Sequence, residues 1–123
     1  MEIEAQQSDR LNLRLADDEI DHWNNALNEV CNGFEVANFH AAIGISKQSA
    51  TALLERMRSI APGQPEVFLL DEVLAVRNAL TMVLAELDPR EFHPRMGFTV
   101  EESKQMRNAL DSLAGQIRFV KTA

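Results

Sequence analysis

The chain has a single cysteine, Cys31, and no tyrosine among its 123 residues. One cysteine excludes an internal disulfide framework, so we expect a protein of the reducing cytoplasm. One tryptophan and six phenylalanines leave little aromatic surface for stacking on single-stranded nucleic acid. The low cysteine content argues against a secreted domain stabilised by disulfides, and the low aromatic content argues against a protein that binds single-stranded nucleic acid.

A long uncharged apolar run is also missing. The most apolar stretch, residues 68–87 (FLLDEVLAVRNALTMVLAEL), is interrupted by Asp71, Glu72, Arg77 and Glu86. Four charges in twenty residues oppose a membrane span. The opening residues, MEIEAQQSDR, lack the basic and apolar regions of a signal peptide. We therefore expect a cytoplasmic protein with no membrane association, in which residues 1–10 form an N-terminal tail.

Recognisable catalytic and cofactor motifs are absent as well. The sequence has no glycine-rich nucleotide loop, no nucleophile motif and no pattern typical of a catalytic triad. Cys31 shares an apolar helical face with Leu27 and Val30, which predicts a buried hydrophobic residue rather than a nucleophile. The expectation is a protein that is not an enzyme and that needs no cofactor.

The net charge of −7 is unevenly distributed. Residues 1–33 hold eight acidic and two basic residues, whereas residues 34–60 hold two acidic and three basic ones. Asp17, Asp18 and Asp21 gather in the first of these segments. They lack the glycine and the ligand spacing of a calcium loop, so they indicate either a solvated helix start or a surface for a basic partner.

Internal duplication is the strongest pattern. Residues 18–60 align without gaps to residues 71–113, and ten of the 43 pairs are identical. Average composition gives roughly 6 % identity by chance, about two or three pairs. The identical pairs include Asn25/Asn78, Phe39/Phe92, His40/His93 and Gly44/Gly97. The repeat predicts one domain, residues 1–123, built from two copies of a single structural unit.

Each copy has the pattern of three helices. Apolar residues recur at helical spacing, with an expected cap at Asp17 or Asp18, at Ser46 and at Thr99. Gly44 and Gly97 suit the left-handed turn that ends each middle helix. The predicted fold is therefore all-α, with about six helices related by a pseudo-twofold axis. The long first helices, residues 17–32 and about 66–87, should pack near that axis.

One short segment has a different period. LNLRL, residues 11–15, alternates apolar and polar residues, which is typical of a strand, and residues 117–120 (IRFV) are its candidate partner. The excess of apolar residues at 68–87 favours a central buried helix. If the six helices do not cover all of these apolar side chains, we expect the exposed ones to form a homodimer interface.

Residues 34–60 (FEVANFHAAIGISKQSATALLERMRSI) join a short helix, a Gly44-Ile45-Ser46 turn and a second capped helix. This segment resembles the helix-turn-helix of winged-helix repressors of the MarR class. The resemblance implies that the helix from Ser46 lies in the major groove of DNA. The residues that would contact bases or phosphates there are Lys47, Gln48, Ser49, Thr51, Arg56 and Arg58.

Histidines offer a further hypothesis. Pseudo-symmetry can bring His40 and His93 together near Glu91, a ligand set that suits zinc or iron. The paired i, i+4 spacing of helical metal ligands is absent, so packing or capping roles are favoured and no metal site is predicted. His22, beside Trp23, is predicted to be solvated.

Two functions remain open from the sequence. The first is a small acidic protein that binds another protein, quite possibly as a homodimer, with Asp17, Asp18 and Asp21 facing a basic partner. The second is a transcriptional regulator that reads DNA with the helix from Ser46.

Overall fold

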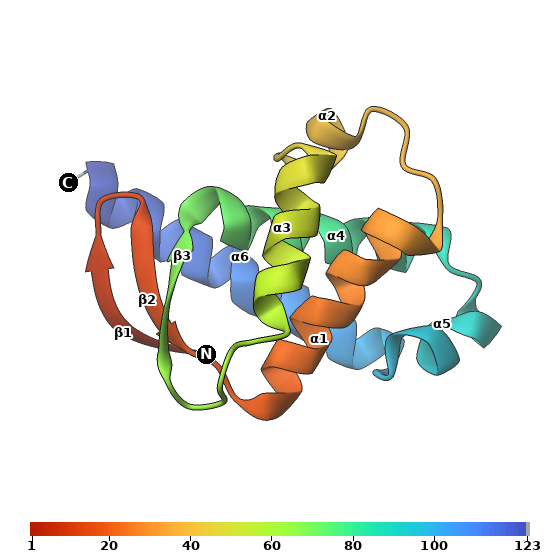
Figure 1. Ribbon diagram of the computed structural model, residues 1–123, viewed down its shortest axis with the longest axis horizontal. Helices are drawn as coiled ribbons and strands as arrows, with labels where there is room; N and C mark the ends of the chain where they lie inside the picture. Colours follow the sequence, from red (N-terminus) through yellow and green to blue (C-terminus); the bar gives the residue numbers. More distant parts are fainter. Residues whose placement is uncertain (123) are drawn as a thin grey trace.

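The computed structural model describes residues 1–122, with side chains at all of these positions except 7 and 117–122. Six α-helices pack beside a three-stranded antiparallel sheet of order β1-β2-β3 that lies at one end of the molecule (Figure 1). Along the chain the elements are β1 (Glu2–Gln7), β2 (Arg10–Arg14), α1 (Asp17–Asn28), the π-helix η1 (Glu29–Gly33), α2 (Phe39–Ile43), α3 (Lys47–Met57), β3 (Pro65–Leu69), α4 (Leu70–Glu86), α5 (Pro89–Met96) and α6 (Val100–Thr122).

The prediction of an all-α fold was wrong because of this sheet. Leu11 and Leu13 of β2 are fully buried on its inner face, opposite Phe68 and Glu66 of β3. The alternation in LNLRL did indicate a strand, but its partners are β1 and β3, whereas residues 117–120 belong to α6. Residues 1–10 are not a tail, since residues 2–7 form β1.

The second long helix begins later than its apolar pattern suggested. Residues 65–69 are extended, and α4 starts at Leu70. The Glu72 carboxylate accepts a hydrogen bond of 2.8 Å from the Leu69 backbone N–H, which fixes the first turn. Glu19 does the same for α1 at the backbone of Ala16, so the expected cap at Asp17 or Asp18 was wrong.

Equivalent elements of the two copies are offset by the 53 residues of the sequence repeat. The span from α1 through η1, residues 17–33, matches α4, residues 70–86. The middle helices α2 and α5 end at residues 43 and 96, and α3 and α6 begin at residues 47 and 100. Antiparallel pairing of β2 with β3, the strands that precede the two long helices, fits a twofold relation between the copies.

Two reciprocal hydrogen bonds join the copies at equivalent positions. Asn25 Nδ2 donates to the carbonyl of Met96 at 2.9 Å, and Asn78 Nδ2 donates to the carbonyl of Ile43 at 2.7 Å. Asn25 and Asn78 correspond in the repeat, as do Ile43 and Met96. Each asparagine therefore satisfies a carbonyl at the end of the middle helix of the other copy, where no intrahelical donor remains.

The conserved spacing within the repeats follows from these contacts. Gly44 and Gly97 have φ values of +99° and +74°, and a Cβ atom on either would lie 3.4 or 3.5 Å from the asparagine of the opposite copy. Ser46 caps α3, and Thr99 and Glu102 form a reciprocal capping box on α6, both as predicted. Phe92 is buried, and Phe39 is half-buried against the core.

Helix α4 occupies the centre of the molecule and packs against α1, α2, α3 and α6. Seven of its side chains are buried: Leu70, Val73, Ala75, Val76, Ala79, Leu80 and Val83. Figure 1 shows α6 running behind the other helices toward the sheet. Because the chain itself covers much of α4, the apolar stretch at 68–87 is no longer an argument for a homodimer.

The cross-copy hydrogen bonds generate the first prediction. Replacing Asn78→Ala leaves the Ile43 carbonyl without its donor, so the free energy of unfolding should fall by about 1–3 kcal/mol. Asn32→Ala is the matched control, because Asn32 is exposed and bonds only to the Asn28 side chain within the same segment. Its effect should stay within about 0.5 kcal/mol. Equal losses in chemical denaturation of the two variants would contradict the assigned role of Asn78.

Candidate functional site

The start of α3 presents the polar residues that the sequence associated with DNA. Lys47, Gln48, Ser49 and Thr51 are all exposed. Ser49 donates its backbone N–H to the Ser46 cap, and the Thr51 hydroxyl donates to the Lys47 carbonyl at 2.9 Å. Lys47 and Gln48 therefore have the freest side chains of this group.

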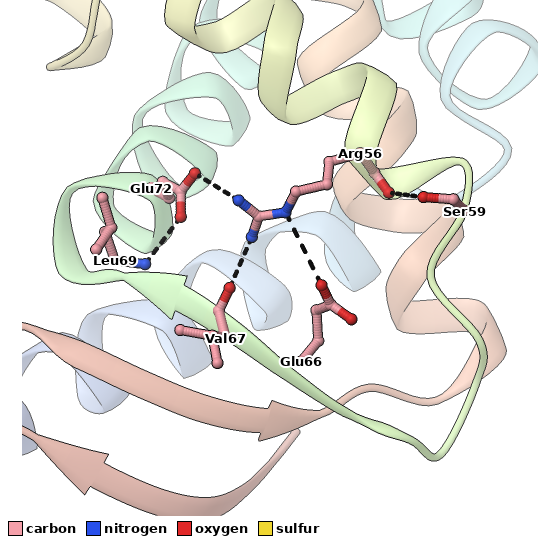
Figure 2. A network of polar contacts seen from close by, with 6 residues as sticks. All are labelled: Arg56, Ser59, Glu66, Val67, Leu69 and Glu72. Carbon is pink, nitrogen blue, oxygen red and sulfur yellow. Dashed lines mark hydrogen bonds and ion pairs between the residues drawn. The ribbon is translucent and has the colours of Figure 1, made fainter.

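Arg56, predicted to reach the DNA backbone, is instead part of the fold. Its guanidinium donates to the Val67 carbonyl at 2.7 Å and to Glu72 at 3.1 Å (Figure 2). Glu66 lies 4.0 Å from Arg56 Nε, and the guanidinium carbon lies 5.2 Å from the centre of the Phe68 ring. Arg56 thus ties α3 to the edge of β3 and to the first turn of α4.

The remaining charges leave a negative surface. Arg58 is exposed and lies 3.8 Å from Glu55. Nine of the 19 acidic side chains are in ion pairs, which leaves ten without a cationic partner among the residues whose side chains the structure describes. Of the ten basic side chains that the structure describes, six are paired and four are not: Arg10, Lys47, Lys104 and Arg107. Lys47 is thus the one unpaired cation of the predicted DNA-binding set.

Asp17, Asp18 and Asp21 are exposed at the start of α1, and none of them has a cationic partner among the described residues. The start of α6 lies beside them, because His22 of α1 is hydrogen-bonded to Ser103 of α6. Glu102 adds a fourth carboxylate, and hydrogen bonds from Thr99 lower its pKa. We call Asp17, Asp18, Asp21 and Glu102 the acidic face.

His22 lies beneath this face, so the prediction of a solvated ring was wrong. The residue is 3 % exposed, and its ring stacks on Phe98 with centroids 3.9 Å apart and planes 6° from parallel. Nε2 lies 2.8 Å from the Ser103 hydroxyl. Burial lowers the pKa of His22, while the carboxylates of Glu102 and Asp18 act in the opposite direction. Burial is the larger effect, which favours a neutral imidazole in the folded protein.

Other residues considered for chemistry lie apart or inside the core. His40 and His93 are exposed on α2 and α5. In the part of the chain that the structure describes, no group of three His, Cys, Asp or Glu side chains is placed to hold a metal ion. Cys31 is buried next to the Thr51 hydroxyl, and burial raises the pKa of its thiol. A raised pKa opposes the thiolate form that a nucleophile requires.

Several side chains whose contacts the structure shows to be important were not identified from the sequence. The stacked pair His22–Phe98 left no local signal, since its members are far apart in the chain. Asn25 and Asn78 did carry a signal, because they are identical in the two copies and Asn78 is polar on a largely apolar helix. The partners of Arg56 depend on a strand that the sequence pattern had merged with a helix.

Comparisons with known protein families, with curated proteins and with solved structures gave no match to this chain. The likeness of residues 34–60 to a MarR-class segment therefore stays a prediction. Over the described residues, none of the helices combines the length and the apolar character needed to cross a bilayer.

The buried histidine predicts how stability depends on pH. Because the pKa of His22 is lowered in the folded state from its ordinary value of 6.5, the unfolded chain takes up a proton first as pH falls. The contribution of His22 should be complete above pH 6.5 and should diminish as pH falls below that value. Urea unfolding of wild type and of His22→Phe at several pH values measures how the free energy of unfolding depends on pH in each protein.

His40→Gln supplies the control, since this exposed ring has no buried contact to lose. His40→Gln should keep the wild-type decline between neutral and mildly acidic pH, and His22→Phe should show a smaller one. An identical decline in all three proteins would mean that His22 does not contribute.

Proposed function

We propose that the chain is a small, non-enzymatic cytoplasmic protein that binds another protein through the acidic face. The partner would present a complementary basic surface. The observation that carries this proposal is the unpaired state of Asp17, Asp18 and Asp21 on the rigid first turns of α1. Six of the ten basic side chains that the structure describes are already paired, and these three carboxylates are unpaired acids that gather at one helix start.

The packing beneath the face adds support. His22, Ser103 and Phe98 hold the starts of α1 and α6 together, so the carboxylates stand on a fixed scaffold. A preorganised charged surface loses little conformational entropy on binding and steers a partner of opposite charge toward it. No cofactor or catalytic group is needed for such a role.

The test compares two triple variants with the same change in net charge. Asp17→Asn, Asp18→Asn and Asp21→Asn neutralise the three aspartates of the acidic face and leave Glu102, which caps α6, in place. The control neutralises three exposed acids elsewhere that have no cationic partner among the described residues: Glu35→Gln, Asp71→Asn and Glu86→Gln. In crosslinking and affinity capture, wild type and the control should retain the same basic partner, and the first variant should lose it. Binding should also weaken as salt is added. Equal capture by both variants, or an acidic partner, would contradict the proposal.

DNA reading by α3 is the second candidate. It is supported by the exposure of Lys47, Gln48, Ser49 and Thr51 on the first turns of a capped helix that follows a glycine turn. In a dimer, two copies of α3 would have to lie about 34 Å apart to enter successive major grooves. The acidic surroundings oppose binding to a polyanion, so we rank this candidate below the protein partner.

Fluorescence anisotropy with labelled random-sequence duplex DNA, measured at several salt concentrations, tests this candidate. If α3 contacts phosphates, binding should appear at low salt, fall steeply with added salt, and weaken in Lys47→Glu. Lys104→Glu is the charge-matched control, because this exposed lysine lies on α6 and not on α3. Absence of binding at every salt concentration, or equal binding by the two variants, would rule out α3 as the reading helix.

A further inference from the structure

The outward surface of the sheet has a character unlike the rest of the molecule. Val67 and Leu69 of β3 are 50 % and 42 % exposed, the two highest values among the large apolar side chains that the structure describes. They are two residues apart on a strand, so both point away from the core. Adjacent exposed apolar residues on a sheet commonly mark a binding surface when polar groups border them.

Strand register shows which residues surround this pair. Val67 pairs with Asn12, and Asn12 pairs with Ala5, so these three side chains form one row across the three strands. Leu69 pairs with Arg10 in the next row. We call Ala5, Arg10, Asn12, Val67 and Leu69 the outer sheet face.

A hollow of about 180 Å³ lies on this face, lined by Ala5, Arg10, Asn12 and Val67 together with parts of Gln6 and Leu11. Sites for drug-sized ligands have volumes of about 300 Å³ or more, whereas a benzene ring fits a cavity of about 150 Å³. The hollow therefore suits a single apolar side chain rather than a whole small molecule.

The charge of Arg10 indicates which residue should lie next to the apolar side chain in a binding partner. Arg10 is exposed and has no acidic partner among the described residues, in contrast to Arg14 of the same strand, which pairs with Glu4. The Asn12 side-chain oxygen is shielded from solvent and accepts no hydrogen bond from the described residues. An unpaired guanidinium next to an apolar hollow complements a carboxylate next to an apolar group.

We infer that the outer sheet face is a docking surface for a partner segment in which an apolar side chain lies next to an acidic one. The apolar side chain fills the hollow against Val67, and the carboxylate pairs with Arg10. This surface is separate from the acidic face, which selects for basic residues, so the two surfaces can bind different parts of a partner or different partners.

Selection of a random peptide library displayed on phage against the immobilised full-length protein tests this inference. The peptides recovered should share an apolar residue flanked by Asp or Glu. Their dissociation constants, measured by fluorescence polarisation, should rise about tenfold or more in Val67→Ser and in Arg10→Gln. Matched controls are Val100→Ser, an exposed apolar residue of α6, and Arg107→Gln, another unpaired arginine; neither should change the affinity.

Three results would overturn the inference: no enriched motif, a motif rich in Lys or Arg, or peptide binding that all four variants share. Light scattering tests whether a second copy of the chain, rather than a partner segment, binds the outer sheet face. A dimer that dissociates in Val67→Ser but persists in Val100→Ser would contradict a partner segment and assign the surface to self-association. Circular dichroism confirms folding, and Arg10→Gln remains informative if Val67→Ser is unstable, because Arg10 is exposed on the sheet.

Discussion

The side-chain amides of Asn25 and Asn78 impose the constraint on which the rest of the structure depends. Each donates to the last carbonyl of a middle helix in the other half of the chain. This contact requires a tight turn after that helix, a glycine whose positive φ forms the turn, and an asparagine at one position of each long helix. Neither half can satisfy its own carbonyl in this way. The buried interface between the halves therefore demands that both be folded.

This arrangement also decides which charges are left for function. Arg56 bonds to Val67 of β3 and to Glu72 of α4, and Arg95 pairs with Glu29 at the start of the π-helix η1. Many basic side chains are thus paired within the fold, while Asp17, Asp18 and Asp21 have no cationic partner in the part of the chain whose side chains are described. The acidic character of the surface follows from composition, with 19 acidic against 12 basic residues, because an ion pair occupies one charge of each sign. The outer sheet face, with exposed Val67 and unpaired Arg10, stands apart from it.

The sequence predicted the helices better than the sheet, for physical reasons. Caps at Ser46 and Thr99 act within one turn, so local patterns reveal them. Phe68, in contrast, lies in an apolar run that reads equally as a buried helix or a buried strand, and only pairing with β2 decides between them. His22 was misplaced for a similar reason, since its place beside Trp23 on a helix indicated a solvated ring, whereas Phe98 and Ser103 from distant sequence bury it. Exposure of Asp17, Asp18, Asp21 and Lys47 agreed with expectation, but the partners of Arg56 could not be read from the chain.

Native-state hydrogen exchange is the most direct measurement of the dependence between the two halves. The relevant amides are those of Leu53 and Leu54 in α3 and of Val76 and Leu80 in α4, all of which are buried. If the halves form one cooperative unit, all four should exchange with the same free energy, equal to that of global unfolding. Exchange in α3 at a free energy lower by about 2 kcal/mol or more would show that the first half opens alone, and would contradict the account.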